Sequence, residues 1–437
     1  MTGATADVLV IGAGVIGAAT AFHLTRLGAG QVTVLERGGV AAGMSSRSSA
    51  LVRMHYTFAP EVDLAVRSDQ MFAGWTDLTG APPVVRRTGF VRIVRPGEED
   101  SLRANVAMQR AHGAQAEVID AAALRELAPG LRADDVTCAA WEPDGGYGDG
   151  AIVAGDLLAA ARAAGAGYRP GTAVRSLIRS GDRVTGVQTD SGVVHAGTVV
   201  LAAGVWAPAL AATAGITLPI ETELHHVAVC AHPAGHGASV ACIDSVTGTY
   251  LRPEAGATMT LVGGFTGPRG ADPDSVSDRA SAADVAGLVE AAAYRVPALA
   301  DAGIARGVTG VYDMTPDARP LLGAWPGVSG LVIAAGFSGM GFKISPATGE
   351  AVAAFIISGG GSAGRSAGRP DTARPGAAGA PAGSGARSGH PGQGPAGSGP
   401  AERGSAGPVD LGPDGPFAPG RFAAGRPVTP PFPYSDD

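Results

Sequence analysis

The hydrophobic pattern of the first 36 residues predicts a strand, a helix and a second strand. Residues 8–11 are an uninterrupted apolar run, which is typical of a buried strand. Apolar residues then recur at helical spacing and stop at Gly28, and residues 31–35 are again rich in β-forming side chains. This order is typical of the start of an α/β domain.

The same periodicities predict helices and strands as far as residue 357. The predicted helices are residues 60–78, 98–112, 120–127 (capped by Asp120), 152–164, a helix from 206, 277–295 and 345–357. The predicted strands are residues 84–94, 173–178, 183–189, 198–201, 225–230, 239–243, 249–252, 258–262, 308–314 and 331–335.

The composition changes after residue 358, where Gly, Pro, Ala, Ser and Arg dominate. Such a segment buries too little apolar surface to offset its ordering entropy, so residues 359–437 are expected to be a Gly/Pro-rich disordered tail. The alternative for its last ten residues, VTPPFPYSDD, is docking or partner binding through a polyproline-type stretch.

Net charge and cysteine content narrow the function classes. The net charge is −7 and no Lys/Arg cluster is present, which argues against a nucleic-acid or anionic-membrane partner. The three cysteines are scattered, so neither a disulfide framework nor a metal site is predicted. Glycines and prolines interrupt the longest apolar stretch, residues 198–220, and no basic segment precedes the first strand. We therefore expect a soluble, cytoplasmic protein.

The turn after the first strand carries the glycine pattern of a dinucleotide site. Gly12 allows the tight turn, Gly14 lets a pyrophosphate approach the backbone, and Gly17 lets the helix pack close to the strand. The helix N-terminus offers free N–H groups to the phosphates, and Glu36 is placed to accept bonds from ribose hydroxyls. The alternative is a glycine-rich turn in another kind of α/β domain.

Three later stretches carry further candidate contacts. The loop GMSSRSS (residues 43–49) can supply N–H and O–H donors to phosphates and ribityl hydroxyls, or else is a solvated turn. TVVLAAGVW (residues 198–206) is a strand that ends in a glycine turn, and GFSGMGFK (residues 336–343) stands directly before a helix.

Together with GAGVIG at residues 12–17, these stretches resemble the D-amino-acid oxidase-like superfamily of FAD proteins, in particular the branch of sarcosine oxidase, its heterotetrameric β subunit and dimethylglycine oxidase. The resemblance covers residues 5–357. It implies a Rossmann-like FAD-binding domain, built from residues 1–80, 145–217 and 306–358, and a β-sheet-rich substrate domain from residues 81–144 and 218–305.

The motifs and the resemblance together assign a set of residues to FAD. A second glycine-rich turn that opens a helix suits the flavin, because a helix N-terminus stabilises the anionic reduced ring. The assigned residues are Gly12, Gly14, Gly17, Glu36, Arg37, Ser45, Ser46, Arg47, Ser48, Val174, Ala203, Gly204, Trp206, Gly336, Ser338, Gly339, Met340, Gly341, Phe342 and Lys343.

The resemblance also implies which residues hold the substrate. Arg53 and Lys343 match the two cations that bind a substrate carboxylate in sarcosine oxidases; the alternatives are a surface or FAD-phosphate contact for Arg53 and a solvated lysine for Lys343. His225 and Tyr250 match residues that orient the amine or take its proton, although either His225 or His226 could face the site.

Departures from the family pattern affect the chemistry. Residues 309–312 hold no cysteine, and GMSSRSS holds no histidine, so the usual covalent flavin linkages are missing and non-covalent FAD is expected. Residues 261–265 lack the lysine that promotes oxygen reduction, which leaves oxygen or an electron carrier as the acceptor. The expected activity is oxidation of the C–N bond of an amino acid or N-methyl amino acid. The alternatives are an NAD-linked dehydrogenase and a flavoprotein subunit of a larger complex that is inactive alone.

Overall fold

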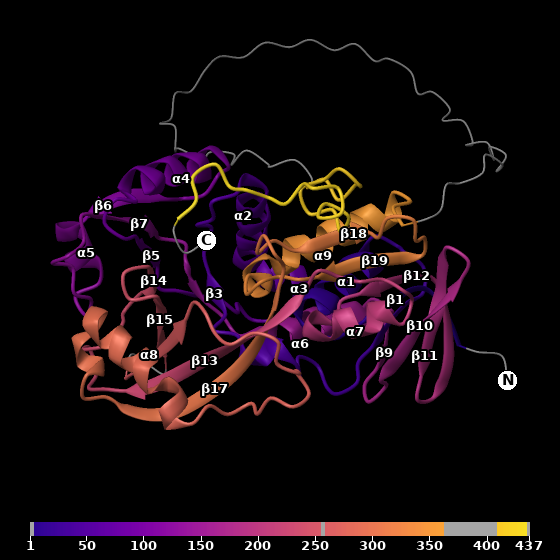
Figure 1. Cartoon of the computed structure of the whole chain (residues 1–437), viewed down its shortest axis with the longest axis horizontal. Coiled ribbons are helices and arrows are strands. Elements are labelled where there is room, and N and C mark those ends of the chain that lie inside the picture. Colours follow the sequence, from indigo (N-terminus) through magenta and orange to yellow (C-terminus); the bar gives the residue numbers. More distant parts are fainter. Residues whose placement is uncertain (1–3, 255–257, 362–408, 435–437) are drawn as a thin grey trace, which may run out of the picture.

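The computed structural model describes residues 4–254, 258–361 and 409–434. Two eight-stranded sheets organise these residues and lie side by side (Figure 1). A third sheet has three short strands.

The first sheet is built around the predicted N-terminal strand. Its strands are β1 (Ala4–Ile11), β2 (Val32–Leu35), β9 (Gly167–Arg169), β10 (Val174–Ser180), β11 (Arg183–Thr189), β12 (Gly192–Leu201), β18 (Leu321–Ala324) and β19 (Leu331–Ala335). β1 pairs in parallel with β2 and β12, and β12 pairs in parallel with β19. Successive β1 residues face opposite sides, because Val8 and Val10 belong to one core cluster while Leu9 and Ile11 belong to another. The apolar run is therefore a strand buried on both faces.

Helices pack on the face of this sheet that carries Val8 and Val10. The helices of this part are α1 (Val15–Arg26), α2 (Ala59–Ala73), α3 (Trp75–Thr79), α6 (Gly150–Ala163), α7 (Ala207–Ala212) and α9 (Gly341–Ile357). α1 lies against both α6 and α9, whereas α7 packs on the opposite face. The predicted helix 60–78 is divided at Gly74, and α9 begins at Gly341 rather than 345. Lys343 consequently lies in the first turn of α9.

The second sheet contains six predicted strands and two, β6 (Glu117–Asp120) and β7 (Cys138–Glu142), that the sequence pattern did not predict. The predicted strands are β5 (Phe90–Ile93), β13 (Glu221–Ala231), β14 (Ala241–Asp244), β15 (Thr249–Glu254), β16 (Met259–Gly264) and β17 (Gly303–Met314). Three helices accompany them: α4 (Glu99–Ala111), α5 (Ala121–Leu127) and α8 (Ala282–Arg295). The side chain of Asp120 caps α5, as the sequence predicts.

One proposed domain boundary has to move. β17 pairs with β13 from one end to the other, from Glu221 opposite Met314 to Ala231 opposite Gly303. Residues 306–314 therefore belong to the second sheet and not to the FAD-binding domain, because their backbone hydrogen bonds are made there.

The three-stranded sheet fixes the segment that carries Arg53. It consists of β3 (Leu51–Val52), β8 (Gly146–Tyr147) and β4 (Arg86–Arg87), with β8 in the middle. The backbone N–H of Met54, directly after Arg53, donates to the buried carboxylate of Glu142 at 2.8 Å. The pairing of β3 with β8 and the hydrogen bond from Met54 to Glu142 hold this segment between the two large sheets.

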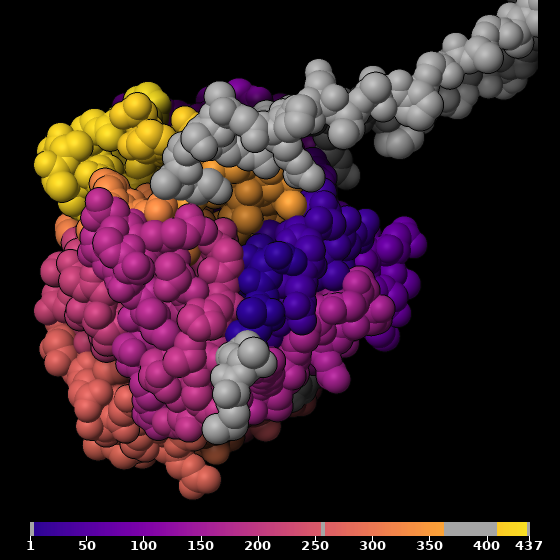
Figure 2. Space-filling view, turned by 90° about the vertical axis from the view of Figure 1, so that its right-hand side faces the viewer, coloured from indigo at the N-terminus to yellow at the C-terminus, as the bar shows by residue number. Residues whose placement is uncertain are grey.

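Residues 409–434 pack against the body, which corrects the expectation of a disordered tail over 359–437. Phe417 is buried, and its carbonyl accepts a 2.8 Å hydrogen bond from the backbone of Leu322 in β18. The segment runs from the side of β18 and α9 toward α4 (Figure 1) and lies on the outside of the molecule (Figure 2). Composition alone misjudged it, because a segment that packs on an existing surface needs only a few large side chains. Residues 362–408 and 435–437 of the predicted tail lie outside the described residues.

Within the described part of the chain, each helix is too short or too polar to cross a membrane. The three cysteines are buried free thiols.

Candidate active site

Two cavities meet at the turn between β19 and α9. A larger one, of about 600 Å³, is lined by the N-terminal glycine turn, the end of β2 and the residues after β12. A smaller one, of about 240 Å³, lies between the second sheet and the start of α9. Phe337 lines the first and Ser338 the second, so the two cavities are neighbours.

The glycines of the first turn differ in conformation and in their position relative to the larger cavity. Gly12 has φ +105°, and a Cβ there would lie 2.4 Å from the carbonyl oxygen of Ala202. Gly14 lines the cavity at the start of α1. Gly17 does not line it: a Cβ at Gly17 would lie 1.9 Å from the Gly12 oxygen, so its role is close packing of α1 on the turn.

Glu36 and Ser45 hold this turn in shape. The Glu36 carboxylate accepts the N–H of Ala13 at 2.9 Å and that of Gly38 at 2.8 Å. The Ser45 hydroxyl accepts the N–H of Val15 at 3.1 Å. Each carboxylate oxygen has a further lone pair, so Glu36 can still accept ribose hydroxyls at the cavity wall.

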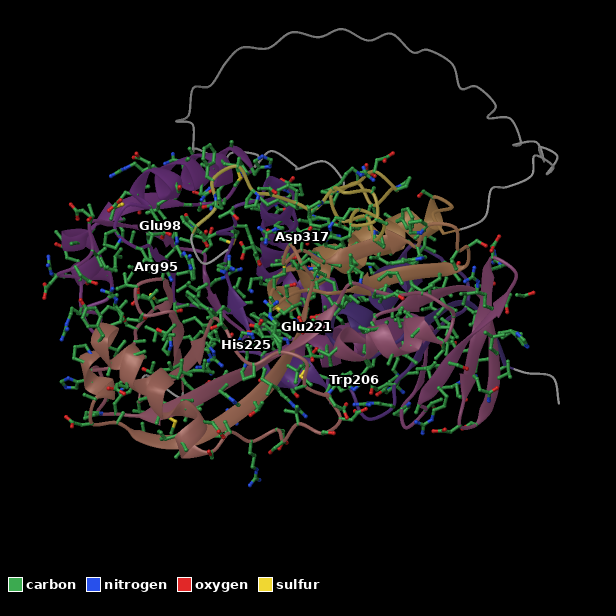
Figure 3. The ribbon with its side chains drawn as sticks, viewed as in Figure 1. Arg95, Glu98, Trp206, Glu221, His225 and Asp317 are labelled. Carbon is green, nitrogen blue, oxygen red and sulfur yellow. The ribbon has the colours of Figure 1, made fainter. Side chains whose placement is uncertain are left out.

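A three-residue contact crosses the edge of the larger cavity. Asp274 accepts hydrogen bonds from Trp206 Nε1 at 2.9 Å and Arg37 Nη1 at 2.8 Å. The Arg37 guanidinium lies 3.9 Å from the centre of a Trp206 ring. Arg37 and Trp206 were predicted, whereas Asp274 comes from the loop before α8 and carries no sequence motif. Trp206 lies in the lower half of the molecule in Figure 3.

The predicted FAD residues divide into cavity walls and supports. The larger cavity is lined by Gly12, Gly14, Glu36, Arg37, Ser45, Arg47, Val174, Ala203, Gly204 and Trp206. The smaller cavity is lined by Ser338, Gly339, Met340 and Lys343. Neither cavity is lined by Gly17, Ser46, Ser48, Gly336, Gly341 or Phe342. Phe342, for example, stacks on Phe72 in the core, with ring centres 5.9 Å apart.

The smaller cavity is strongly cationic. Arg53, Arg92, Arg319 and Lys343 line it, and none of the lining residues in the described chain is acidic. Arg319 is balanced from behind by buried Glu61, with Nε and Oε1 3.1 Å apart. Arg53 Nη1 donates to the carbonyl of His55, while its buried Nε has no hydrogen-bond partner among the described residues. An anionic ligand would satisfy such a cavity.

Lys343 is the only lysine among the 437 residues. Its Nζ is 3.4 Å from the carbonyl of Gly339, and the residue is 8% exposed. Burial, and then the neighbouring charge of Arg53, hold its pKa well below the usual value. A ligand carboxylate beside Nζ would favour the charged ammonium form.

The structure places Tyr250 at the smaller cavity and His225 behind it. Tyr250 and Tyr312 line the cavity and hydrogen-bond to each other through their side chains. His225, on β13 near the centre of the molecule in Figure 3, stacks on Tyr312 with ring centres 3.7 Å apart. Its ring nitrogens lie 3.0 Å from Glu223 Oε1 and 3.2 Å from the Gly264 oxygen. Neither His225 nor His226 lines the cavity, and His226 instead lies 3.1 Å from the Thr309 hydroxyl.

Comparison with known proteins assigns the chain to a family. A model of the DAO family, described as FAD dependent oxidoreductase, matches residues 7–355. The chain belongs to this family. It is thus an FAD-dependent oxidoreductase of the amino-acid oxidase type, and FAD is its cofactor.

Relatives and solved structures agree with the assignment. The chain is 30% identical to 4-methylaminobutanoate oxidase (formaldehyde-forming) of Paenarthrobacter nicotinovorans, over 80% of this chain and 43% of that protein. It is 28% identical to sarcosine oxidase subunit beta of Rhizobium meliloti (strain 1021), over 81% of this chain and 85% of the relative. The crystal structure of L-proline dehydrogenase from P. horikoshii superposes with a TM-score of 0.75 at 26% identity, covering 82% and 95% of the two chains. The chain spans only 40–43% of the length of several curated relatives.

The larger cavity of this DAO-family chain fits the dinucleotide. It offers the N-terminus of α1 to phosphates and Glu36 to a ribose, and Arg47 brings a buried Nη1 that has no hydrogen-bond partner among the described residues. None of the three cysteines lines either cavity.

Sequence reasoning missed several walls of the smaller cavity. His55, Arg92, Arg319 and Tyr434 come from four separated segments, and only folding brings them together. One signal was available in the sequence, because His55 and Tyr56 lie in the same short stretch, residues 51–56, as the predicted Arg53.

Proposed function

We propose that this DAO-family chain oxidises the C–N bond of an amino acid or N-methyl amino acid. The substrate's carboxylate binds Arg53 and Lys343, and its amine lies near Tyr250. The observation that carries the proposal is the junction of a dinucleotide cavity with a cationic cavity that has no acidic lining residue in the described chain.

The charges of the smaller cavity favour an anion of small size. Lys343 is buried and Arg53 is partly buried in the wall, where each charge-assisted hydrogen bond to a carboxylate contributes about 1.5–3 kcal/mol. A volume of about 240 Å³ suits a small amino acid better than a peptide.

The proton chemistry of the site rests on two tyrosines. Burial raises the pKa of Tyr250, so its side chain is a neutral phenol at neutral pH. A phenol can accept a hydrogen bond from an amine N–H and hold a neutral amine in place, while Tyr312, stacked on His225, fixes the direction of the Tyr250 hydroxyl. Bound FAD supplies the acceptor for the hydride of the C–H bond next to nitrogen. Water would hydrolyse the imine product, and oxygen or an electron carrier would be the final electron acceptor.

Anaerobic mixing with a panel of N-methyl and D- and L-amino acids tests the proposal. Loss of flavin absorbance by one of these compounds is the expected result. With that compound, Arg53→Met and Lys343→Met should each raise KM about 10- to 150-fold, the equivalent of one lost charge-assisted bond. The matching amine without a carboxylate should show no such loss, and Arg86→Met, at an exposed arginine of β4, is the matched control.

A measurement independent of turnover uses the single lysine. Reductive methylation followed by mass spectrometry reports Lys343 and the N-terminal amine only. The carboxylate compound should protect Lys343 and leave the N-terminus reactive. Full turnover by both variants, together with unprotected Lys343, would exclude the assignment.

A second candidate is a flavoprotein subunit that is inactive alone. It is favoured by the 85% coverage of a relative named a subunit. Flavin that no compound of the panel bleaches in the isolated chain, but that is bleached after addition of a co-purifying partner, would support this candidate.

A further inference from the structure

Tyr434 reaches the smaller cavity from a part of the chain beyond the family match. The family model ends at residue 355, whereas Tyr434 lies in the C-terminal segment 409–434 and is one of the cavity's lining residues. It is only 5% exposed, while Phe432, two residues earlier, is 42% exposed. The two aromatic side chains therefore point in opposite directions, one into the molecule and one into solvent.

The segment is fixed to the loop that carries Arg319. Arg421 is 2% exposed and binds both oxygens of Asp317, at 2.8 Å and 2.7 Å. Arg421 also donates to the backbone oxygen of Arg319 at 2.7 Å, and the N–H of Val428 donates to Asp317 at 2.9 Å. The loop that holds one cation of the cavity is thus the anchor of the segment (Figure 3 labels Asp317).

The end of the segment is held as firmly at the cavity itself. Tyr434 Oη lies 2.9 Å from His55 Nε2, and their rings stack with centres 5.9 Å apart. The Arg92 guanidinium lies 4.8 Å from the Tyr434 ring centre. The side chain of Asn105 in α4 donates to the Phe432 oxygen at 2.9 Å. Because His55 and Arg92 both contact it, the Tyr434 ring forms a rigid part of the cavity wall.

We propose that residues 409–434 form the outer wall of the substrate cavity and that Tyr434 is a specificity-determining residue. It limits the size of the carboxylate-bearing amine that the cavity admits. This inference rests on the proposed function for the nature of the substrate, but the wall itself is independent of it. A ring held by His55 and Arg92 cannot swing aside without breaking both contacts, so larger substrates are excluded.

The test compares Tyr434→Ala, Tyr434→Phe and the matched control Phe432→Ala, all in the full chain with FAD bound. The first measurement is kcat/KM for a series of substrates that differ only in side-chain length. Tyr434→Ala should raise the ratio of long to short substrates at least 10-fold through KM, while Tyr434→Phe retains the ring and should keep the selectivity within about 3-fold. The second measurement is acrylamide quenching of flavin fluorescence, which requires no substrate.

The outcomes separate the wall from the function. Increased quenching and relaxed size selection in Tyr434→Ala, with Phe432→Ala unchanged, support the proposal. A uniform fall in kcat for all substrates, or equal quenching in all variants, overturns it. If no amine reduces the flavin but Tyr434→Ala alone shows increased quenching, the proposed function fails and the wall stands.

Discussion

Replacing Glu142 by Gln should make the chain's stability less sensitive to a rise in pH between about 4.5 and 8. Glu142 ends β7, is fully buried, and accepts the backbone N–H of Met54 through Oε2. Its other oxygen, Oε1, has no hydrogen-bond partner among the described residues. Burial is the main cause that raises its pKa from 4.5 to about 8, against the opposing effects of the Met54 N–H and Arg53.

The magnitude follows from the two pKa values. Below pH 4.5 the carboxyl is protonated in the folded and unfolded states; above pH 8 it is ionised in both. Between these limits the folded state binds more protons, so stability from this group falls as pH rises. At 1.36 kcal/mol per pKa unit the full loss is about 5 kcal/mol, and relaxation of the folded state reduces it, so we expect about 2–5 kcal/mol. Gln has the same shape and can accept the Met54 N–H, but it does not ionise.

The assay is urea unfolding of both proteins at saturating FAD from pH 5 to pH 9. Subtracting the free energy of unfolding of wild type from that of Glu142→Gln removes the contributions of the other titrating groups. This difference should increase in favour of the variant from pH 5 to pH 9. Glu117→Gln, at an exposed position of β6, is the control and should leave the slope unchanged. Stability curves for Glu142→Gln and wild type that stay parallel from pH 5 to pH 9 would refute the reasoning.

Two further substitutions test the larger cavity. Gly17→Ala should abolish retention of FAD on gel filtration, because the new Cβ would lie 1.9 Å from the backbone oxygen of Gly12; Gly155→Ala in α6, where nothing lies within 4 Å, should stabilise the chain by about 0.5–1 kcal/mol. Asp274→Ala should raise the dissociation rate of FAD several-fold, since Arg37 and Trp206 lose their shared acceptor. It should change stability by less than about 1 kcal/mol, as expected of an exposed pair. A dissociation rate equal to that of Asp134→Ala, a remote exposed pair, would contradict the role given to Asp274.

Local patterns predicted the fold where backbone geometry depends on nearby residues. β11 (Arg183–Thr189) and β19 (Leu331–Ala335) have the predicted bounds, because alternation and short apolar runs fix a strand locally. The placement of β17 could not be predicted in this way. Its partner β13 lies about 80 residues earlier in the chain. The sequence of β17 itself does not indicate which sheet β17 joins.

The candidate site likewise combines residues that a local motif or a resemblance predicts with residues whose position depends on distant parts of the chain. The glycine turn with Glu36 is a local motif, and the chain's resemblance to known flavoproteins supplied Arg53, Tyr250 and Lys343, which do share a cavity. His225 was offered with them, but side-chain direction along β13 depends on the register with β16 and β17, which places it behind Tyr312. Tyr434 lies beyond a Gly/Pro-rich stretch, where composition argued for disorder.

The positive charges of the smaller cavity are balanced by acidic residues that do not line it. Arg53, Arg319 and Lys343 would repel one another in a buried space, yet no acidic residue of the described chain lines that space. The compensating groups lie one layer outward: Glu61 beside Arg319, and Asp317, which accepts the backbone N–H of Arg319 at 3.1 Å. Although burial opposes it, the Arg421 guanidinium holds the pKa of Asp317 below its ordinary value, so this acid is ionised at neutral pH. The arrangement leaves the positive charges facing the cavity, where a carboxylate can bind. It also places the anchor of the C-terminal segment directly beside Arg319, one of the cations that line the cavity.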